Sequence, residues 1–463
     1  MRNDFDRGVF PKFSGWNRAG RPAQRATRGL SRESAGLAGL LLLAILPVAG
    51  AQEIPRPSVT KQKVQQSLPT VSNFRVGQVL MRIDARVGVE FVDNVDLTPT
   101  GSPDFIVTPE IGVNATWAVT KQNTLRFRAS VGYSNYFNHP RLNRQSVQIS
   151  PDSALSFDVY AGDVKINFHE QFSLQDESIN QGALSGVAQL GRFTNTIGTR
   201  ILWDMNDVIL SLGYDHFNFI TTGGADSSAG SLAANIAQLD HSTDQLSTSA
   251  SFKLNSVALG GIEITGSSSA YPKSSASDFT SLSAGPYLEL QLTRYTHLFV
   301  SAGYKSFTSA GGGAPAAVSL DPSVAVPSRG GTQAGYYTNL SFIHTLNRYY
   351  GDRLDIGHSD EADALNGQAQ TNFARYQSTW KVNSKVTLNF GLFLEDVHEV
   401  TGTALNGLIP SDYWRSGVSV GTGYRLTEHV GLGLGYQFTT KHSQRADQNY
   451  SQNSVRISLG YQF

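Results

Sequence analysis

The fold is decided by the segment Tyr450-Ser-Gln-Asn-Ser-Val455-Arg-Ile-Ser-Leu-Gly-Tyr-Gln-Phe463. Apolar side chains occupy every second position from Val455 to Phe463, and Arg, Ser, Gly and Gln lie between them. Successive side chains of a strand point to opposite faces, so this segment predicts a ribbon with one apolar and one polar face. An apolar edge in a soluble sheet promotes aggregation, whereas the closing strand of a membrane barrel has its edge paired and its apolar face in lipid. The segment therefore favours a transmembrane β-barrel.

The same ending resembles the C-terminal strand of bacterial outer-membrane proteins. In those proteins the terminal aromatic residue is part of the signal that the barrel-insertion machinery reads. From this resemblance we expect two partners, the outer-membrane lipid and that machinery, and a location in the bacterial cell outer membrane.

The N-terminal region has the features of an export signal. No stretch reaches the roughly 18–20 apolar residues that a membrane helix needs. The apolar run from Leu37 to Val48 follows several arginines and precedes Ala49-Gly50-Ala51, which predicts a signal peptide with a basic lead over residues 1–51. The long lead indicates an early start codon or an extended type of signal. Residues 52–78, which contain three prolines, are expected to form a periplasmic segment with little structure, and residues 79–463 the barrel.

The charge balance excludes some classes of function. The lead holds 8 basic and 3 acidic residues, so the mature chain has 29 basic and 34 acidic residues. Without a basic excess, we expect no nucleic-acid partner. The chain has no cysteine and therefore no thiol to oxidise after export.

The alternation of apolar and polar residues recurs from Val79 to the end of the chain. Short polar turns alternate with long polar loops, which is the plan of outer-membrane barrels, with periplasmic turns and extracellular loops. We predict an all-β fold, a transmembrane antiparallel up-and-down β-barrel of about 18 strands. The weakest expected strand is 349–356, where charged residues interrupt the apolar face. The turns are expected at 120–123, 161–163, 204–207, 255–256, 293–294, 346–348, 382–385 and 427–428, and the main loops at 139–150, 176–191, 221–243, 308–331, 357–364 and 401–410.

Seven Gly-Tyr pairs support this arrangement. In each pair the tyrosine falls on the apolar side of its strand, where its ring suits the boundary between hydrocarbon and headgroups. A soluble sandwich could also contain such pairs, but a soluble barrel of this size would need an apolar interior that side chains could not fill. A propeller is less compatible, because we find a shared periodicity without a shared blade signature. The tyrosines are Tyr133, Tyr214, Tyr304, Tyr336, Tyr424, Tyr436 and Tyr461.

Seven basic residues fall on the expected lumen side of neighbouring strands. They are predicted to line the pore and to form a basic arc, partly neutralised by Asp84, Glu90, Glu110 and Asp158. Charges that line a pore tune its selectivity, but cross-strand ion pairs that only solvate the wall would give the same pattern. Tyr287 and Tyr337 share the lumen side and are candidates for stacking on sugar rings. The basic residues are Arg82, Arg86, Arg126, Arg128, Lys165, Arg200 and Arg456.

The sequence contains no motif of known catalytic chemistry. There is no His-Glu-x-x-His, Gly-x-Ser-x-Gly or Walker sequence, and the ten histidines are scattered. We therefore expect no catalytic residues, no metal site, no cofactor and no enzymatic activity. Asp360 and Glu361 are expected in a solvated acidic turn, for which a divalent cation is the less favoured alternative.

The end of the first strand resembles a known family. It reads Val89-Glu-Phe-Val-Asp93-Asn94-Val95-Asp-Leu-Thr-Pro99, and a second strand of the type Ile-Gly-Val-Asn-Ala follows. This is similar to the beta-barrel porin 2 family, outer-membrane barrels often encoded with exopolysaccharide genes. The resemblance implies a passive channel for polar solutes, with exopolysaccharide export as one role and polysaccharide as a partner. A nutrient-uptake porin, an adhesin or scaffold, and a barrel lipase or protease stay open as alternatives.

Overall fold

The structure is a computed structural model that describes residues 74–145, 147–175, 190–224, 240–272, 278–309, 331–363, 367–401, 412–444 and 446–463. The chain divides into two units, Met1–Leu41 and Leu42–Phe463. The expected signal peptide and residues 52–73 lie outside the described residues. Within the described residues, no helix is long and apolar enough to cross a membrane.

All strands of the described residues belong to one antiparallel sheet. The alternating sequence explains these elements, because each strand presents apolar residues on one face and polar residues on the other. Two short 3₁₀ helices, η1 (Pro140–Gln145) and η5 (Ala446–Gln448), lie in connections. The strands are β1 (Phe74–Val76), β2 (Val79–Val92), β3 (Asp104–Ala118), β4 (Thr124–Tyr133), β5 (Asn135–Tyr136), β6 (Val147–Ile149), β7 (Ala154–Ala161), β8 (Val164–Gln175), β9 (Leu190–Asp204), β10 (Val208–Gly224), β11 (His241–Lys253), β12 (Ala258–Ala270), β13 (Phe279–Thr293), β14 (Thr296–Ser309), β15 (Gly331–His344), β16 (Tyr350–Asp363), β17 (Gly367–Lys381), β18 (Val386–Thr401), β19 (Tyr413–Arg425), β20 (Val430–Ser443) and β21 (Tyr450–Gln462).

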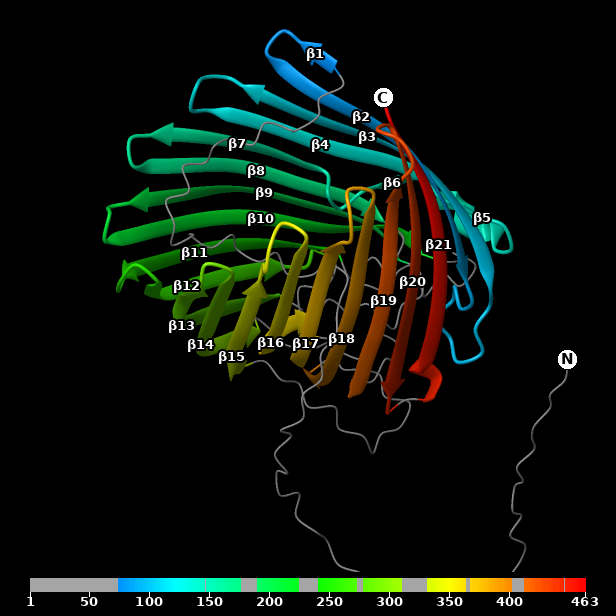
Figure 1. The fold of residues 1–463 in the computed structure, drawn as a ribbon. Helices are drawn as coiled ribbons and strands as arrows, with labels where there is room; N and C mark the ends of the chain where they lie inside the picture. The colour runs from blue at the N-terminus through cyan, green and yellow to red at the C-terminus, as the bar shows by residue number, and fades with distance from the viewer. Residues whose placement is uncertain are drawn as a thin grey trace, which may run out of the picture. The chain divides into compact units, whose positions relative to one another are not determined.

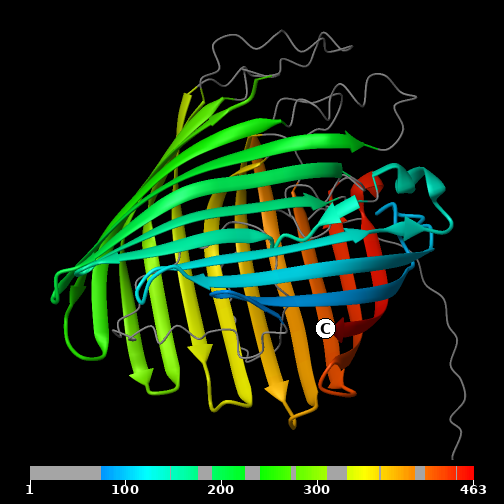
Figure 2. The same ribbon diagram turned by 90° about the horizontal axis from the view of Figure 1, so that it is seen from above.

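The sheet closes on itself as a barrel. Each long strand pairs with the next along the chain, and β21 pairs with β2 from Asp84↔Gln462 to Val92↔Ser454. Figure 1 shows β21 beside β2, and Figure 2 shows the same wall from above. β5 extends the β4 ribbon against β3, and β6 pairs with β4 ahead of β7. If β4 with β5 and β6 with β7 are each counted as one strand, and the short β1 is left out, the described residues form a closed 18-strand barrel. This confirms the predicted fold class.

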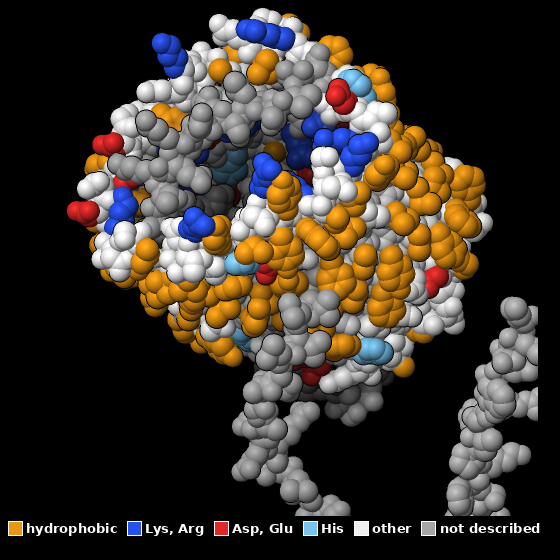
Figure 3. All heavy atoms as spheres, in the orientation of Figure 1, with side chains coloured by type: hydrophobic (Ala, Val, Ile, Leu, Met, Phe, Trp, Pro, Cys, Tyr) orange, Lys and Arg blue, Asp and Glu red, His pale blue; other side chains and the backbone are white. Residues whose placement is uncertain are grey.

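The outer face of the wall is apolar. Val87 and Val89 on β2 and Ile457 and Leu459 on β21 are among the exposed large hydrophobic residues. Hydrophobic side chains cover most of the visible outer wall in Figure 3, while lysine and arginine side chains surround the hollow. The tyrosines of all seven Gly-Tyr pairs are exposed, between 41% and 57%, which confirms their predicted side of the strand.

The eight short turns lie where the sequence predicts them, and they share one end of the barrel, which we call the turn end. The opposite end, the loop end, carries the longer connections. One predicted loop is wrong: residues 357–363 belong to β16, which is regular strand up to Asp363. Residues 176–189, 225–239, 310–330 and 402–411 of the other predicted loops lie outside the described residues.

Most of the weakest expected strand, residues 349–356, belongs to β16, and two of its charged residues pair with each other. Arg353 donates to Asp355 through Nε at 2.7 Å and through Nη2 at 3.0 Å. This pair lies on the face opposite Ile356, which is exposed. The Arg353 and Asp355 charges are therefore compatible with a strand, whereas Asp352, on the same face as Ile356, keeps one buried carboxylate oxygen without a hydrogen-bond partner.

The described end of the expected N-terminal segment also has structure. β1 pairs with the first residues of β2, from Phe74↔Met81 to Val76↔Val79. These β2 residues lie beyond the reach of β21, whose pairing with β2 ends at Asp84. β1 thus covers the part of the β2 edge that the last strand leaves open at the turn end, which reduces the exposed edge.

Candidate functional site: the inner wall

The seven predicted basic residues all lie on the inner face, on strands whose exposed apolar residues have the opposite parity. Each one approaches a carboxylate within 4 Å, and the four acidic residues predicted to neutralise the arc are among the partners. Asp152 and Asp215 are further partners that the sequence did not predict. The pairs are Arg82–Asp84 (3.9 Å), Arg86–Glu110 (3.9 Å), Arg126–Asp158 (2.7 Å), Arg128–Asp152 (3.3 Å), Lys165–Asp158 (3.1 Å), Arg200–Asp215 (3.9 Å) and Arg456–Glu90 (3.9 Å).

The closing strands contribute part of this arc. Arg456 on β21 lies over Gly88 of β2, where an added Cβ would be 3.1 Å from its guanidinium nitrogens. Its Nη1 is 3.9 Å from Glu90 on β2. Opposite charges on adjacent strands stabilise their pairing modestly, so this contact supports closure of the barrel as well as its inner polarity.

A continuous polar network crosses β4, β7, β8, β9 and β10. Asp158 accepts hydrogen bonds from Arg126 Nη1 at 2.7 Å and from Asn167 Nδ2 at 2.8 Å. Asn167 Oδ1 lies 3.1 Å from His169 Nδ1, and His169 Nε2 lies 2.7 Å from Asp215 Oδ1. The four predicted basic residues on β4, β8 and β9 do not act alone, because most of them belong to or border this network.

A second ionic cluster lies on β17, β18 and β19, and the sequence analysis missed it. Glu395 accepts from Arg415 Nε at 2.9 Å and Nη2 at 2.6 Å, and from Arg375 Nη2 at 3.0 Å. The side chains of Arg415 and Glu395 are 1% and 3% exposed. Lys441 on β20 lies nearby in the same part of the wall, with Nζ 4.1 Å from the centre of the Tyr413 ring. The alternation of β19 could have predicted that Arg415 faces inward, because Arg415 follows the outward-facing Trp414.

The inner face also carries aromatic rings beyond the predicted Tyr287 and Tyr337. At the loop end, five rings from neighbouring strands contact one another in sequence, with centroids 4.9 to 6.3 Å apart. Nearer the turn end, Tyr287 stacks on Phe299 in a small buried cluster with Ile209 and Leu259. Side chains on one face of adjacent strands lie close enough to pack together, so this part of the wall excludes water locally. The five rings are Phe219, His241, Tyr271, Phe279 and Phe307.

Tyr287 and Tyr337, the predicted sugar-stacking residues, are both on the inner face. Tyr287 is buried and its hydroxyl forms a hydrogen bond with Ser251. Tyr337 donates to Glu263 Oε1 at 3.1 Å. Glycines make room for them, because a Cβ at Gly261 would lie 2.5 Å from the Tyr287 ring and one at Gly303 2.5 Å from the Tyr337 ring. Both rings therefore lie against the wall, with their hydroxyls bonded to it.

The Asp-Asn motif that carries the family resemblance has a structural role at the loop end. Asp93 accepts from the backbone and side-chain amides of Asn453 at 2.7 and 2.6 Å. Asn94 Nδ2 donates to Ser451 O at 2.9 Å, and Gln452 Nε2 donates to Asn94 O at 2.7 Å. These bonds join the ends of the first and last strands, so the motif fastens the seam of the barrel.

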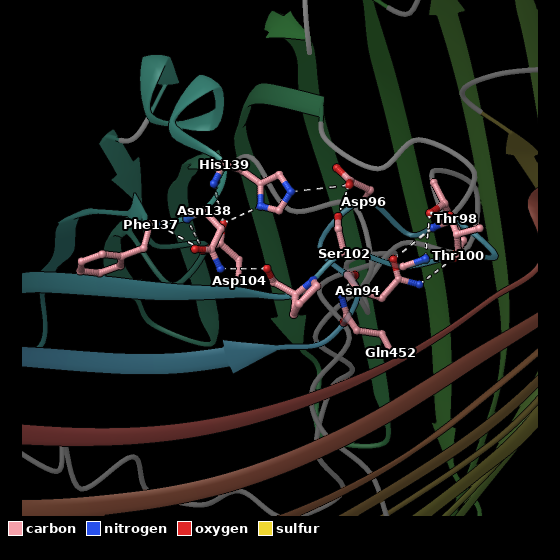
Figure 4. Close-up of polar contacts among 12 residues, drawn as sticks. Asn94, Asp96, Thr98, Thr100, Ser102, Asp104, Phe137, Asn138, His139 and Gln452 are labelled. Carbon is pink, nitrogen blue, oxygen red and sulfur yellow. Dashed lines mark hydrogen bonds and ion pairs between the residues drawn. The ribbon is translucent and has the colours of Figure 1, made fainter.

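A neighbouring carboxylate anchors the next connection, as Figure 4 shows. Asp104 is fully buried and accepts backbone N–H groups of Phe105, Phe137, Asn138 and His139 at 2.7 to 3.1 Å. The His139 ring lies between Asp104 at 2.8 Å and Asp96 at 3.9 Å. Ser102 donates to Asp96. Each of these polar groups supports loop structure, and the described residues contain no group of three or more acidic or histidine side chains arranged to hold a metal.

No family model matches the chain, and no curated protein matches it. Solved structures with a similar fold include Pseudomonas aeruginosa OpdK with vanillate, at 9% identity and a TM-score of 0.45 over 83% of this chain and 99% of that one. They also include P. aeruginosa OccK2 (OpdF) in complex with glucuronate, at 10% identity and a TM-score of 0.45 over 83% and 98%. The outer-membrane OmpT of Vibrio cholerae has 11% identity and a TM-score of 0.37 over 84% and 99%. These comparisons assign the chain no family and no substrate.

Proposed function

We propose that the chain is an outer-membrane channel through which polar solutes diffuse passively. The supporting observation is that apolar side chains cover the outer face of a closed 18-strand wall and charged side chains lie on its inner face. Its outer face exposes apolar residues over many strands, more than a soluble monomer tolerates. Its inner face carries the charged networks. Such a wall is stable when hydrocarbon covers the outside and water wets the inside.

We also propose that the seven predicted basic residues line this channel as part of a nearly balanced arc. The seven cations face six different carboxylates, since Arg126 and Lys165 share Asp158. Rings of one sign select strongly for the opposite ion, whereas paired charges select weakly. The arc therefore favours broad passage of polar solutes.

Planar-bilayer recordings test this function directly. The purified barrel should produce stepwise conductance in KCl, and proteoliposomes that contain it should swell in small sugars and amino acids. A non-conducting scaffold or adhesin would produce neither. Exopolysaccharide export, the role implied by the family resemblance, predicts in addition that deletion of the gene traps polymer in the periplasm. A nutrient porin predicts slower growth on a limiting solute.

A further inference from the structure

His169 and Asp215 meet across an intervening strand. His169 is on β8 and Asp215 is on β10, and both are paired in register with Gly198 of β9. The His169 Nε2 atom is 2.7 Å from Asp215 Oδ1. Side chains two strands apart are normally separated by the residue between them, so this contact depends on what stands at position 198.

Because Gly198 has no side chain, His169 and Asp215 can contact each other across β9. A Cβ at Gly198 would lie 2.1 Å from Asp215 Oδ1 and 2.8 Å from His169 Nε2. Any larger residue would therefore occupy the space in which the two side chains meet. The three residues together form a built site on the inner face, with the His169 and Asp215 side chains 24% and 13% exposed.

Each ring nitrogen of His169 faces an oxygen atom of a neighbouring side chain. Asn167 Nδ2 donates to Ser156 Oγ at 2.9 Å and to Asp158 Oδ1 at 2.8 Å, which orients the amide with its oxygen toward His169 Nδ1. The other ring nitrogen faces the Asp215 carboxylate. A neutral imidazole donates from only one nitrogen, whereas both nitrogens of an imidazolium donate. Two acceptors, one at each nitrogen, therefore match the charged ring.

The charged groups around the ring are few. Asp158 on β7, Lys165 on β8, Arg200 on β9 and Asp215 on β10 face this part of the wall, and Arg126 on β4 bonds Asp158. Three permanent cations thus oppose two carboxylates, so a proton on His169 raises the local excess from one positive charge to two. We propose that the His169–Asp215 pair over Gly198 makes the ion selectivity of the channel depend on pH. The inference rests on the proposed channel function.

The expected effect is moderate. One unit charge about 7 Å from the ion path, in water at about 0.1 M salt, changes the ratio of anion to cation permeability roughly 2- to 3-fold. The change should be larger at lower ionic strength, because screening weakens.

Reversal potentials in a KCl gradient between pH 5 and 8 measure this ratio. We expect the wild-type channel to become 2- to 3-fold more anion-preferring as the pH falls. His169→Gln should remove the change. His216→Gln is the matched control, because His216 forms the same kind of contact with Asp244, at 2.8 Å, on the outer face. That variant should behave as the wild type does.

Ring nitrogen NMR spectra of the histidine-labelled barrel, assigned with His169→Gln, supply a readout that needs no conduction. A doubly protonated His169 at pH 5 is expected, and a ring that is singly protonated there would overturn the inference. A conducting channel whose pH dependence survives His169→Gln would also overturn it while leaving the proposed function intact. A barrel that conducts nothing would remove both.

Discussion

Glu395→Ala should strongly destabilise the barrel, because it leaves two guanidinium groups facing each other without their shared carboxylate. Arg415 approaches that carboxylate at 2.6 Å and Arg375 at 3.0 Å. Arg415 is 1% exposed, so water cannot solvate it in place of the carboxylate. Removing one partner of a buried ion pair costs about 3–5 kcal/mol, and we expect the free energy of unfolding to fall by that amount.

Urea titrations of the barrel in lipid vesicles, followed by tryptophan fluorescence, measure this loss. Arg128→Ala is the matched control, because the Arg128–Asp152 pair has a similar separation of 3.3 Å but side chains that are 58% and 65% exposed. Exposed ion pairs contribute about 0–1 kcal/mol. If Glu395→Ala does not fold, Glu395→Gln keeps the volume of the side chain and should show an intermediate loss. Equal small losses for Glu395→Ala and Arg128→Ala would refute the reasoning that burial makes this cluster costly to break.

Asp104→Asn should weaken the anchor of β5 and η1 by about 2 kcal/mol, because a carboxylate accepts these N–H groups more strongly than an amide. Amide hydrogen exchange should become faster in that segment alone, and unchanged exchange would contradict the prediction. Gly261→Ala should cost about 1–3 kcal/mol, since its Cβ would lie 2.5 Å from a tyrosine ring, whereas Gly423→Ala, with nothing within 4 Å, should cost far less in the same urea titration. Arg82→Glu with Arg126→Glu removes two cations and adds two anions, so reversal potentials should move toward cation preference; unchanged potentials would mean that these groups do not face the ion path.

The face of each strand could be predicted because it depends on local order alone. Alternation placed the Gly-Tyr tyrosines on the outer face, and the structure confirms this at each of them. That the seven basic residues line a pore stays a prediction. The turns could be predicted for the same reason, since short polar breaks separate the alternating segments. The face of each side chain and the positions of the turns can both be predicted without knowing which residues of neighbouring strands lie opposite one another.

Contacts between strands could not be predicted from alternation. Asp215 lies 46 residues after His169 in the sequence, and their contact depends on the registers of two successive strand pairs. A shift of one residue in either register would turn one of the side chains to the outer face. Asp152 escaped prediction for a related reason, because it precedes β7 and reaches Arg128 from the connection to that strand.

Glycines at inner positions hold information that the alternation pattern alone does not use. Gly198 allows His169 to reach Asp215, Gly261 makes room for the Tyr287 ring, and Gly88 accommodates the Arg456 guanidinium. In each case a glycine of inner parity lies beside a long side chain from a neighbouring strand, because only a missing Cβ leaves space for it against the wall. An inner glycine therefore predicts a crossing side chain only where a neighbouring strand carries a long polar or aromatic residue close to it in register. At Gly423, where an added Cβ would meet nothing within 4 Å, no side chain crosses, so the glycine is informative only together with its cross-strand neighbours.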